Sequence, residues 1–188
     1  YAQLIEADPG GDGELVEKGV EHILHESTRL HRMVIQLLEM ADRSERQELS
    51  RVDMGSLIRS VSEAMEIKAN RYGAHIRLKL EPELLVWGQE ERLRQVFINL
   101  IDNAVKYGEE GTEIRISGGH RKGRVLFSVS NKGKQMSEEE LKHIFEPFYR
   151  ADKEYSREQG SAGLGLSICQ KIMREHKGVI WAENRPDE

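Results

Sequence analysis

The stretch from Arg92 to Gly108 constrains the fold more than any other, because its apolar residues recur at helical spacing. Read as a helix, it carries an apolar stripe made of Leu93, Val96, Phe97, Leu100, Ile101 and Ala104. The same helix places Asn99, Asn103 and Lys106 at positions i, i+4 and i+7, close to one edge of that stripe. Two asparagines one turn apart need a reason, since amide side chains are poor helix formers.

These polar positions allow two interpretations. In the first, the two asparagines are solvated residues of a surface helix, and taken alone this interpretation is favoured. In the second, they form an oxygen-rich edge for a hard cation such as Mg²⁺, and the lysine meets the phosphates that the metal carries. The glycine-rich segment around Gly163 decides between the two.

The composition fits a soluble globular chain of 188 residues, with one medium domain or one domain plus a helical appendage. The net charge of -5 argues against non-specific nucleic-acid binding. Cys169 is alone and cannot form an internal disulfide, so we expect a reducing compartment and a buried structural thiol. No apolar run approaches the roughly 18 residues needed to span a bilayer, and no signal peptide is visible. Because the chain starts at Tyr1 rather than at a methionine, we expect it to be a piece of something longer.

Residues 1–46 predict a helical-hairpin arm: the end of a helix, a breaker cluster at residues 8–13, and a long helix from about Glu14 to Arg46. A heptad seam runs along the long helix, formed by Val20, Ile23, Ser27, Leu30, Val34, Leu37 and Ala41. An arm this short buries too little alone, so we expect a homodimeric bundle with a second copy. Because no cysteine or clustered carboxylate completes a zinc set, we interpret its histidines as solvated: His22, His25 and His31.

Residues 47–188 predict an α+β domain, a two-layer mixed β-sheet with helices on one face. Strands are expected at residues 48–52, 75–80, 84–87, 113–117, 124–130 and 179–182. Beside the asparagine helix, helices are expected after the N-cap Asp53, after the capping box at Ser137, and from Leu164 to His176. A glycine-rich turn joins the strands at 113–117 and 124–130, and residues 152–162 have the charged, breaker-rich composition of a loop or lid.

The segment Gly160-Ser-Ala-Gly163-Leu164-Gly165 is a glycine-rich turn that opens a helix. Backbone N–H groups at a helix N-terminus bind anions, and glycines let phosphates approach closely. The segment is neither a Walker A loop, which needs Gly-Lys-Ser/Thr, nor a Rossmann fingerprint, which needs a preceding strand. By itself, a loop that merely needs positive φ explains it at least as well.

Together, four motifs resemble the nucleotide-binding boxes of sensor histidine kinases. The order and spacing of that family's N, G1, F and G2 boxes are matched by Asn99-x-x-x-Asn103, Asn131-Lys-Gly133, Phe145-Glu-Pro-Phe-Tyr-Arg150 and Gly163-Leu-Gly165. The run from Ile23 to Ala41 also resembles the second helix of the family's dimerisation and histidine-phosphotransfer domain. The resemblance covers almost the whole chain and implies a Bergerat ATP-binding fold of the GHKL superfamily.

The resemblance implies ATP and Mg²⁺ as ligands and a role for each matching residue. Asn103 would ligate the Mg²⁺ that bridges the phosphates, with Asn99 beside it, and Lys106 would meet a phosphate. Tyr107 would lie along the adenine, and Asn131 stands where the family has an aspartate that hydrogen-bonds the adenine amino group. The residues that would surround the nucleotide are Gly133, Gly160, Gly163, Leu164 and Gly165. The lid cations that could reach the γ-phosphate are Arg150, Lys153 and Arg157. Of the whole set, the catalytic candidates are Asn99, Asn103, Lys106, Arg150 and Arg157.

Two departures from the family pattern bear on activity. The G1 box of the family is Asp-x-Gly-x-Gly, but this chain has Asn131 and Gln135 at its ends, so we expect weaker or altered nucleotide binding. The family's phosphoacceptor lies in a His-Glu-x-Arg-Thr-Pro-like box, which this chain lacks. His25 does not replace it, because it lies on the second helix, where the family has no acceptor.

The implied function is the catalytic core of a protein-histidine kinase, which transfers the γ-phosphoryl group of Mg-ATP to a histidine for relay to an aspartate of a response-regulator receiver domain. We expect a cytoplasmic part of a membrane-anchored sensor, with no membrane contact of its own. A GHKL ATPase is disfavoured, because Asn99 replaces a general-base glutamate and an amide cannot take a proton. A serine-kinase anti-sigma factor is disfavoured by the heptad arm. A degenerate nucleotide sensor that acts through interactions alone remains an alternative.

Overall fold

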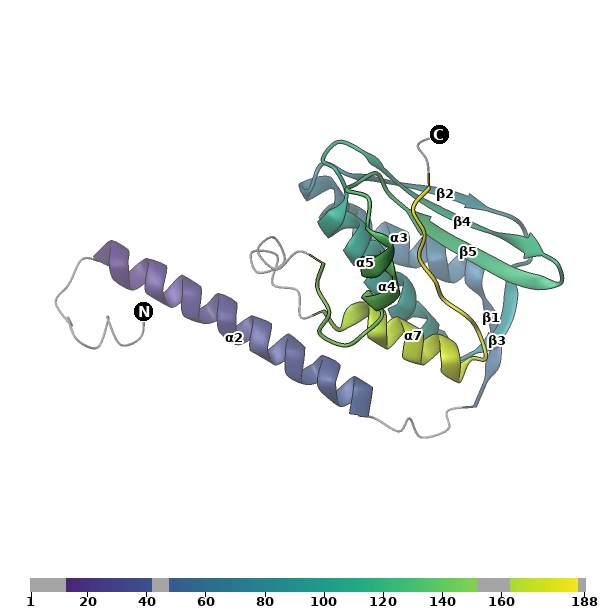
Figure 1. The fold of residues 1–188 in the computed structure, drawn as a ribbon, viewed down its shortest axis with the longest axis horizontal. Coiled ribbons are helices and arrows are strands. Elements are labelled where there is room, and N and C mark those ends of the chain that lie inside the picture. The colour runs from purple at the N-terminus through teal and green to yellow at the C-terminus, as the bar shows by residue number, and fades with distance from the viewer. Residues whose placement is uncertain (1–12, 42–47, 152–162, 186–188) are drawn as a thin grey trace.

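The computed structural model describes residues 13–41, 48–151 and 163–185. In these ranges a three-stranded sheet lies over two helices, α3 and α4, and a further helix, α7, packs against α4 on the other side (Figure 1). A two-stranded sheet lies at one end of this body, and the long helix α2 extends away from it. The arrangement confirms the α+β fold expected from the sequence.

The larger sheet has the strand order β2-β4-β5. Its bounds are β2 (His75–Leu80), β4 (Glu113–Arg121) and β5 (Arg124–Ser130). β2 pairs parallel to β4, and β4 pairs antiparallel to β5, so the sheet is mixed as predicted. The smaller sheet pairs β1 (Ser50–Asp53) antiparallel to β3 (Leu85–Gly88).

The hairpin between β4 and β5 differs from the expected one. We predicted a glycine-rich turn after residue 117, but Gly118 and Gly119 lie inside β4. Gly118 is needed there because a Cβ at this position would lie 2.7 Å from the ring of Phe127 on β5. The turn itself is Lys122 and Gly123, both with positive φ, which is the backbone of a two-residue hairpin loop.

The helices begin where the capping residues predict. α3 (Met54–Arg71) starts after Asp53, whose Oδ1 accepts hydrogen bonds from the backbone N–H groups of Gly55 and Ser56. The short α5 (Glu138–His143) starts with the predicted capping box between Ser137 and Glu140. Among the described residues the domain also contains α4 (Glu90–Tyr107) and α7 (Gly165–Glu175).

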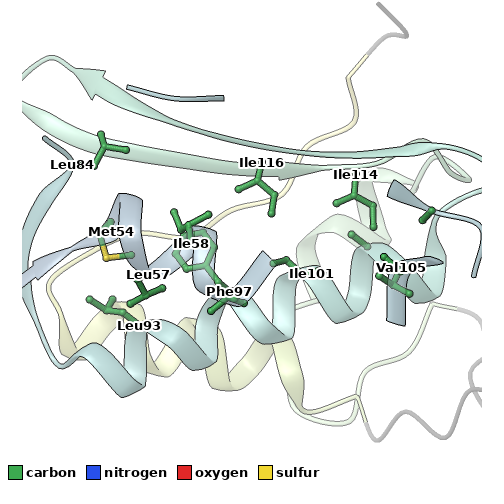
Figure 2. Packing of buried hydrophobic residues seen from close by; sticks show 14 of the residues in the cluster. Met54, Leu57, Ile58, Leu84, Leu93, Phe97, Ile101, Val105, Ile114 and Ile116 are labelled. Atoms are coloured by element: carbon green, nitrogen blue, oxygen red, sulfur yellow. The ribbon is translucent and has the colours of Figure 1, made fainter. Parts of the chain in front are cut away.

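Buried apolar side chains fill the space between the sheet and the helices α3 and α4. Ile114 and Ile116 project from β4 toward Phe97 and Ile101 of α4 (Figure 2). Phe97 also packs edge-on against Phe127 of β5, with ring centroids 5.5 Å apart. The apolar stripe of α4 is therefore core, as its helical spacing predicted.

A second, smaller core lies between α4 and α7. It consists of Val96, Leu164, Ile168, Cys169 and Ile172. Cys169 is the buried structural thiol that we predicted, and burial raises its pKa to about 12. This core holds the start of α7 against the middle of α4.

Two predicted elements need correction or lie partly outside the described residues. Residues 179–182 form no strand, because no segment among the described residues pairs with them. Ile180 packs on the second core, and the Asn184 side chain bonds the backbone of Met136. The alternation of side chains was real, but alternation alone does not supply a pairing partner. The long helix is α2 (Gly13–Ala41), and residues 42–46 of the prediction lie outside the described part, as do residues 1–12 of the expected hairpin.

α2 lies partly against α7 and leaves most of its apolar side chains exposed. The exposed ones are Val20, Ile23, Leu24, Leu30, Val34, Ile35, Leu37 and Leu38. His22, His25 and His31 are exposed too, as expected of solvated histidines. Among the described helices, none combines the length and the apolar character that crossing a membrane requires.

Candidate functional site

The two asparagines of α4 lie beside the glycine-rich start of α7. Asn99 is half-buried, and its Nδ2 donates a hydrogen bond to the carbonyl oxygen of Gly165 at 3.4 Å. A Cβ on Gly165 would lie 3.7 Å from Cγ of Asn99, an ordinary van der Waals contact. Asn103 is half-buried one turn further along α4. The packing therefore brings the first and the last of the four motifs together.

α7 begins without a side-chain cap. Its N-cap residue is the buried Leu164, which makes no capping hydrogen bond with its side chain. The backbone N–H groups of the first turn carry the positive end of the helix dipole, and such uncapped ends bind anions. The start of α7 thus offers anion-binding groups next to Asn99.

Gly163 fits tightly against the backbone of the F-box segment. Its carbonyl accepts a hydrogen bond from the N–H of Phe148 at 3.0 Å, and a Cβ on it would lie 2.7 Å from the Tyr149 carbonyl oxygen. Its φ of 72° is also one that glycine adopts readily. Arg150 follows Tyr149 in the chain. Its Nε and Nη2 atoms are buried and make no hydrogen bond to any described residue. A guanidinium with unpaired N–H groups can donate hydrogen bonds to a bound anion.

The G1 segment folds over the other end of α4. A Cβ on Gly133 would lie 2.7 Å from the carbonyl oxygen of Tyr107, so only glycine fits this approach. The carbonyl of Lys132 accepts hydrogen bonds from the N–H of Glu109 at 2.9 Å and from Nδ2 of Asn131 at 3.0 Å. Tyr107, Asn131 and Gly133 are therefore gathered at the C-terminal end of α4. Tyr107 lies roughly 12 Å along the helix axis from Asn99, from the 1.5 Å rise per residue.

Lys106 takes part in a contact that sequence reasoning missed. Its Nζ lies 2.7 Å from Oδ2 of Asp102, and the other carboxylate oxygen of Asp102 pairs with Lys68 of α3. Burial acts to raise the pKa of Asp102, but hydrogen bonds from Lys106 and Lys68 outweigh it and leave that pKa lowered. The i, i+4 spacing of Asp102 and Lys106 could have revealed the first pair. Nothing in the sequence links Lys68 to them.

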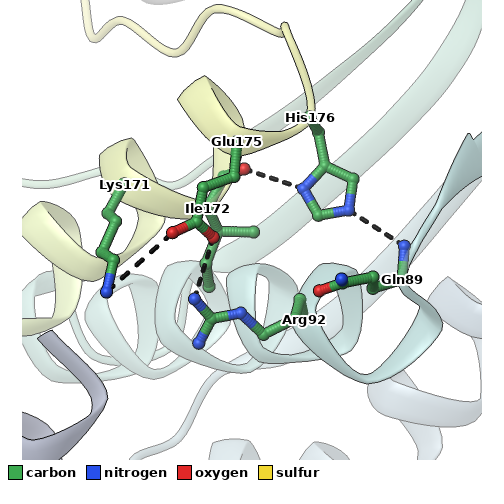
Figure 3. A network of polar contacts seen from close by, with 6 residues as sticks. All are labelled: Gln89, Arg92, Lys171, Ile172, Glu175 and His176. Atoms are coloured by element: carbon green, nitrogen blue, oxygen red, sulfur yellow. Dashed lines mark hydrogen bonds and ion pairs between the residues drawn. The ribbon is translucent and has the colours of Figure 1, made fainter. Parts of the chain in front are cut away.

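A polar network joins the N-terminal end of α4 to the C-terminal end of α7 (Figure 3). His176 donates from Nδ1 to the carbonyl of Ile172 at 2.8 Å, because a carbonyl can only accept, and its Nε2 accepts from the N–H of Gln89 at 3.0 Å. Arg92 of α4 also pairs with Glu175 of α7 at 2.9 Å. The sequence did not predict this network, which fixes how α4 and α7 lie against each other.

Not every candidate residue can be placed. Lys153, Arg157 and Gly160 lie outside the described residues. Among the residues that the structure does describe, no three or more histidine, cysteine, aspartate or glutamate side chains gather into a metal site. Asn103 therefore offers a single amide oxygen to a hard cation, which suits Mg²⁺ only if phosphates and waters supply the remaining ligands.

Residues 88–188 match the sequence model of a family described as histidine kinase-, DNA gyrase B- and HSP90-like ATPases. The match spans more than half of the chain, so the chain belongs to this family and carries its ATPase fold. Within the family its relatives are sensor histidine kinases, which confirms the class that the four motifs indicated.

Sensor histidine kinase YkoH of Bacillus subtilis is 35% identical over 191 residues, covering 100% of this chain and 41% of the relative. Sensor-like histidine kinase SenX3 of Mycobacterium tuberculosis is 29% identical over 188 residues, covering 98% of this chain and 45% of the relative. The chain thus spans less than half the length of these curated relatives.

Solved structures give the same result. Histidine kinase ThkA in complex with response regulator protein TrrA aligns with a TM-score of 0.77 and 30% identity, over 98% of this chain and 52% of that one. The nucleotide-free catalytic domain of ThkA aligns with a TM-score of 0.66 and 34% identity, over 74% of this chain and 90% of that one. The chain therefore belongs to the sensor histidine kinases and carries a histidine kinase-type ATPase domain.

Proposed function

We propose that this chain binds Mg-ATP and transfers its γ-phosphoryl group to a histidine outside the chain. The contact between Asn99 and the uncapped start of α7 carries the proposal, because it joins an amide edge to an anion-binding helix end. Residues 47–188 would be the ATP-binding catalytic domain, and residues 1–46 the dimerisation arm.

The charges around this contact suit a triphosphate. The uncapped first turn of α7 would receive the phosphates, and Gly163 and Gly165 would leave room for them. The partly buried guanidinium of Arg150 and the ammonium of Lys106 would neutralise their charge, with Lys153, Arg157 and Gly160 completing the lid. Phosphoryl transfer asks a protein mainly for such positioning and neutralisation.

The metal would depend on the nucleotide. The amide oxygen of Asn103 would hold Mg²⁺, with Asn99 beside it, and phosphate oxygens and waters would provide most of the ligands. When bound, Mg²⁺ supplies charge neutralisation at the phosphates. The base would lie at the other end of α4, along Tyr107 and against Asn131, where Gly133 leaves the backbone close to the helix.

The partners follow from the same proposal. The phosphoryl group would pass from the acceptor histidine to an aspartate of a response-regulator receiver domain, and a relative solved with a response regulator supports this. The exposed apolar side chains of α2 support a homodimer through the arm. The chain would work as the cytoplasmic part of a membrane-anchored sensor in a two-component system.

The test is Asn103→Asp, measured as the affinity for a non-hydrolysable ATP analogue with and without Mg²⁺. We expect the variant to fold normally and to lose the normal dependence of binding on metal, because a charge replaces the amide next to the phosphates. Asn70→Asp is the matched control, since Asn70 is exposed on α3 and uses Oδ1, which aspartate keeps, to contact His75. Unchanged affinity and metal dependence in Asn103→Asp would contradict the role of Asn103 as a ligand of Mg²⁺.

A second candidate is a nucleotide-binding module that acts through interactions alone. It is favoured by the exposed Asn131, whose Nδ2 bonds the neighbouring Lys132 carbonyl and which lacks the charge of an aspartate. Mixing this chain with a peptide helix that carries an acceptor histidine and labelled ATP separates the two. A phosphorylated peptide supports the kinase, whereas nucleotide binding without transfer supports the module.

A further inference from the structure

A cluster of three charged side chains lies beside the candidate site. Asp102, one residue before Asn103, binds Lys106 of its own helix through Oδ2 at 2.7 Å and Lys68 of α3 through Oδ1. The side chains are 24% exposed for Asp102, 11% for Lys106 and 39% for Lys68. Each carboxylate oxygen thus has its own ammonium, and the half-buried cluster carries one excess positive charge.

This arrangement creates a competition for Lys106. A lysine held by a carboxylate has part of its charge neutralised there, and as it turns toward a phosphate the carboxylate left behind repels that phosphate. The two ion pairs place this carboxylate between both ammonium groups, so the competition for Lys106 follows from the geometry of the cluster. With Lys68 on the other oxygen, the carboxylate stays compensated when Lys106 departs.

We propose that Lys68 is a positioning residue for nucleotide phosphates: it holds Asp102 so that Lys106 is free to turn from the carboxylate to the phosphate. The inference rests on the proposed function, because it deepens the role of Lys106 in that same site. Lys68 itself comes from α3 and acts only through Asp102. The alternative is that Lys68 merely ties α3 to α4.

The experiment measures dissociation constants of a non-hydrolysable ATP analogue and of adenosine, with Mg²⁺, by calorimetry. The proteins are wild type, Lys68→Met, Lys68→Arg, Asp102→Asn and the double variant Lys68→Met/Asp102→Asn. We expect Lys68→Met to weaken the analogue roughly threefold to tenfold, because the uncompensated carboxylate would repel the phosphates, and to leave adenosine unchanged. Lys68→Arg should bind the analogue like wild type. In the Asp102→Asn background, Lys68→Met should have no further effect, because no carboxylate is left to hold.

The control is Lys79→Met, which removes the same charge from an exposed position on β2. An equal loss of affinity in Lys79→Met would mean a long-range charge effect and overturn the inference. Equal weakening of adenosine and analogue by Lys68→Met, undiminished in the Asp102→Asn background, would mean a structural tie and also overturn it. If wild type binds the analogue and Lys68→Met binds it as well, only this inference fails. If wild type does not bind the analogue, the proposed function fails with it.

Discussion

Asn99 of α4 donates a hydrogen bond to the carbonyl oxygen of Gly165, 66 residues further along the chain, at 3.4 Å. Both residues adjoin the small core, because Gly165 follows Leu164 and Asn99 lies one helical turn after Val96. Apolar packing between α4 and α7 therefore sets the geometry of the polar site. Changes that disturb this packing should change nucleotide binding even where they touch no nucleotide.

Gly163 provides a direct test of the packing against the F-box segment. Gly163→Ala should lower the free energy of unfolding by more than the roughly 1–2 kcal/mol that left-handed backbone costs a residue with a Cβ, because the new atom would also lie 2.7 Å from the Tyr149 carbonyl oxygen. Gly111→Ala is the matched control, since Gly111 has a similar φ of 76° and open space around it. Denaturant unfolding of both variants gives the comparison. Equal losses would show that the contact with Tyr149 adds nothing.

Cys169 should be inert in the folded protein. Burial raises its pKa to about 12, so the thiolate fraction at pH 8 is on the order of 10⁻⁴, and the side chain is inaccessible as well. Alkylation with iodoacetamide at pH 8, followed by mass spectrometry, should label the denatured chain quickly and the native chain only as it unfolds. Rapid labelling of the native protein would contradict the tight core between α4 and α7.

Asp53 gives a pH dependence with a defined sign. Hydrogen bonds from Ser56 and Gly55 lower the pKa of its carboxyl in the folded state below the ordinary value of 3.8. The charged cap therefore contributes stability above that ordinary value, and this stability is lost as the pH falls through the lowered pKa. Asp53→Asn keeps the acceptor oxygen without the charge, while Asp53→Ala should cost about 1 kcal/mol at pH 7.

The measurement for Asp53 is thermal unfolding of wild type and Asp53→Asn between pH 7 and pH 2.5. We expect the advantage of wild type to shrink below about pH 4, because the aspartate becomes protonated there and the asparagine does not titrate. A difference that stays constant over this range would mean that the charge of Asp53 does not contribute to the cap.

Asn131→Asp should tighten the binding of ADP. A carboxylate accepts a stronger hydrogen bond from an amino group than an amide does, and Asn131 is exposed at the end of β5, so the new charge costs little desolvation. We expect a gain of roughly threefold to tenfold, measured by calorimetric titration. Weaker binding would mean that the pocket is adapted to the amide, for instance through the bond from Nδ2 to the Lys132 carbonyl.

Local patterns predicted the helices and most strands of this fold. The period of Val96, Phe97 and Ile101 identified the buried face of α4, and the capping residues Asp53 and Ser137 marked where helices begin. Such features depend on neighbours within a few residues, which a sequence displays directly. The alternation at 179–182 was misleading because pairing depends on a distant strand.

The motifs of the candidate site could be predicted from the sequence, but the distant residues that hold its helices in place could not. Asn99 was found because asparagine is a poor helix former, and Gly163 because a glycine-rich turn that opens a helix can bind phosphates. Lys68, which reaches Asp102 from 34 residues away, and His176, which reaches Gln89 from 87 residues away, could not be found in this way. Their partners are chosen by the packing of α3 and α7 on α4, and no local pattern encodes that packing.

The most direct test of the site is calorimetric titration of the wild-type chain with a non-hydrolysable ATP analogue, with and without Mg²⁺. We expect saturable binding that requires the metal, because Asn103 offers one ligand and the phosphates must bring the rest. An absence of binding at millimolar nucleotide would contradict the nucleotide site formed by α4, the G1 segment and the start of α7.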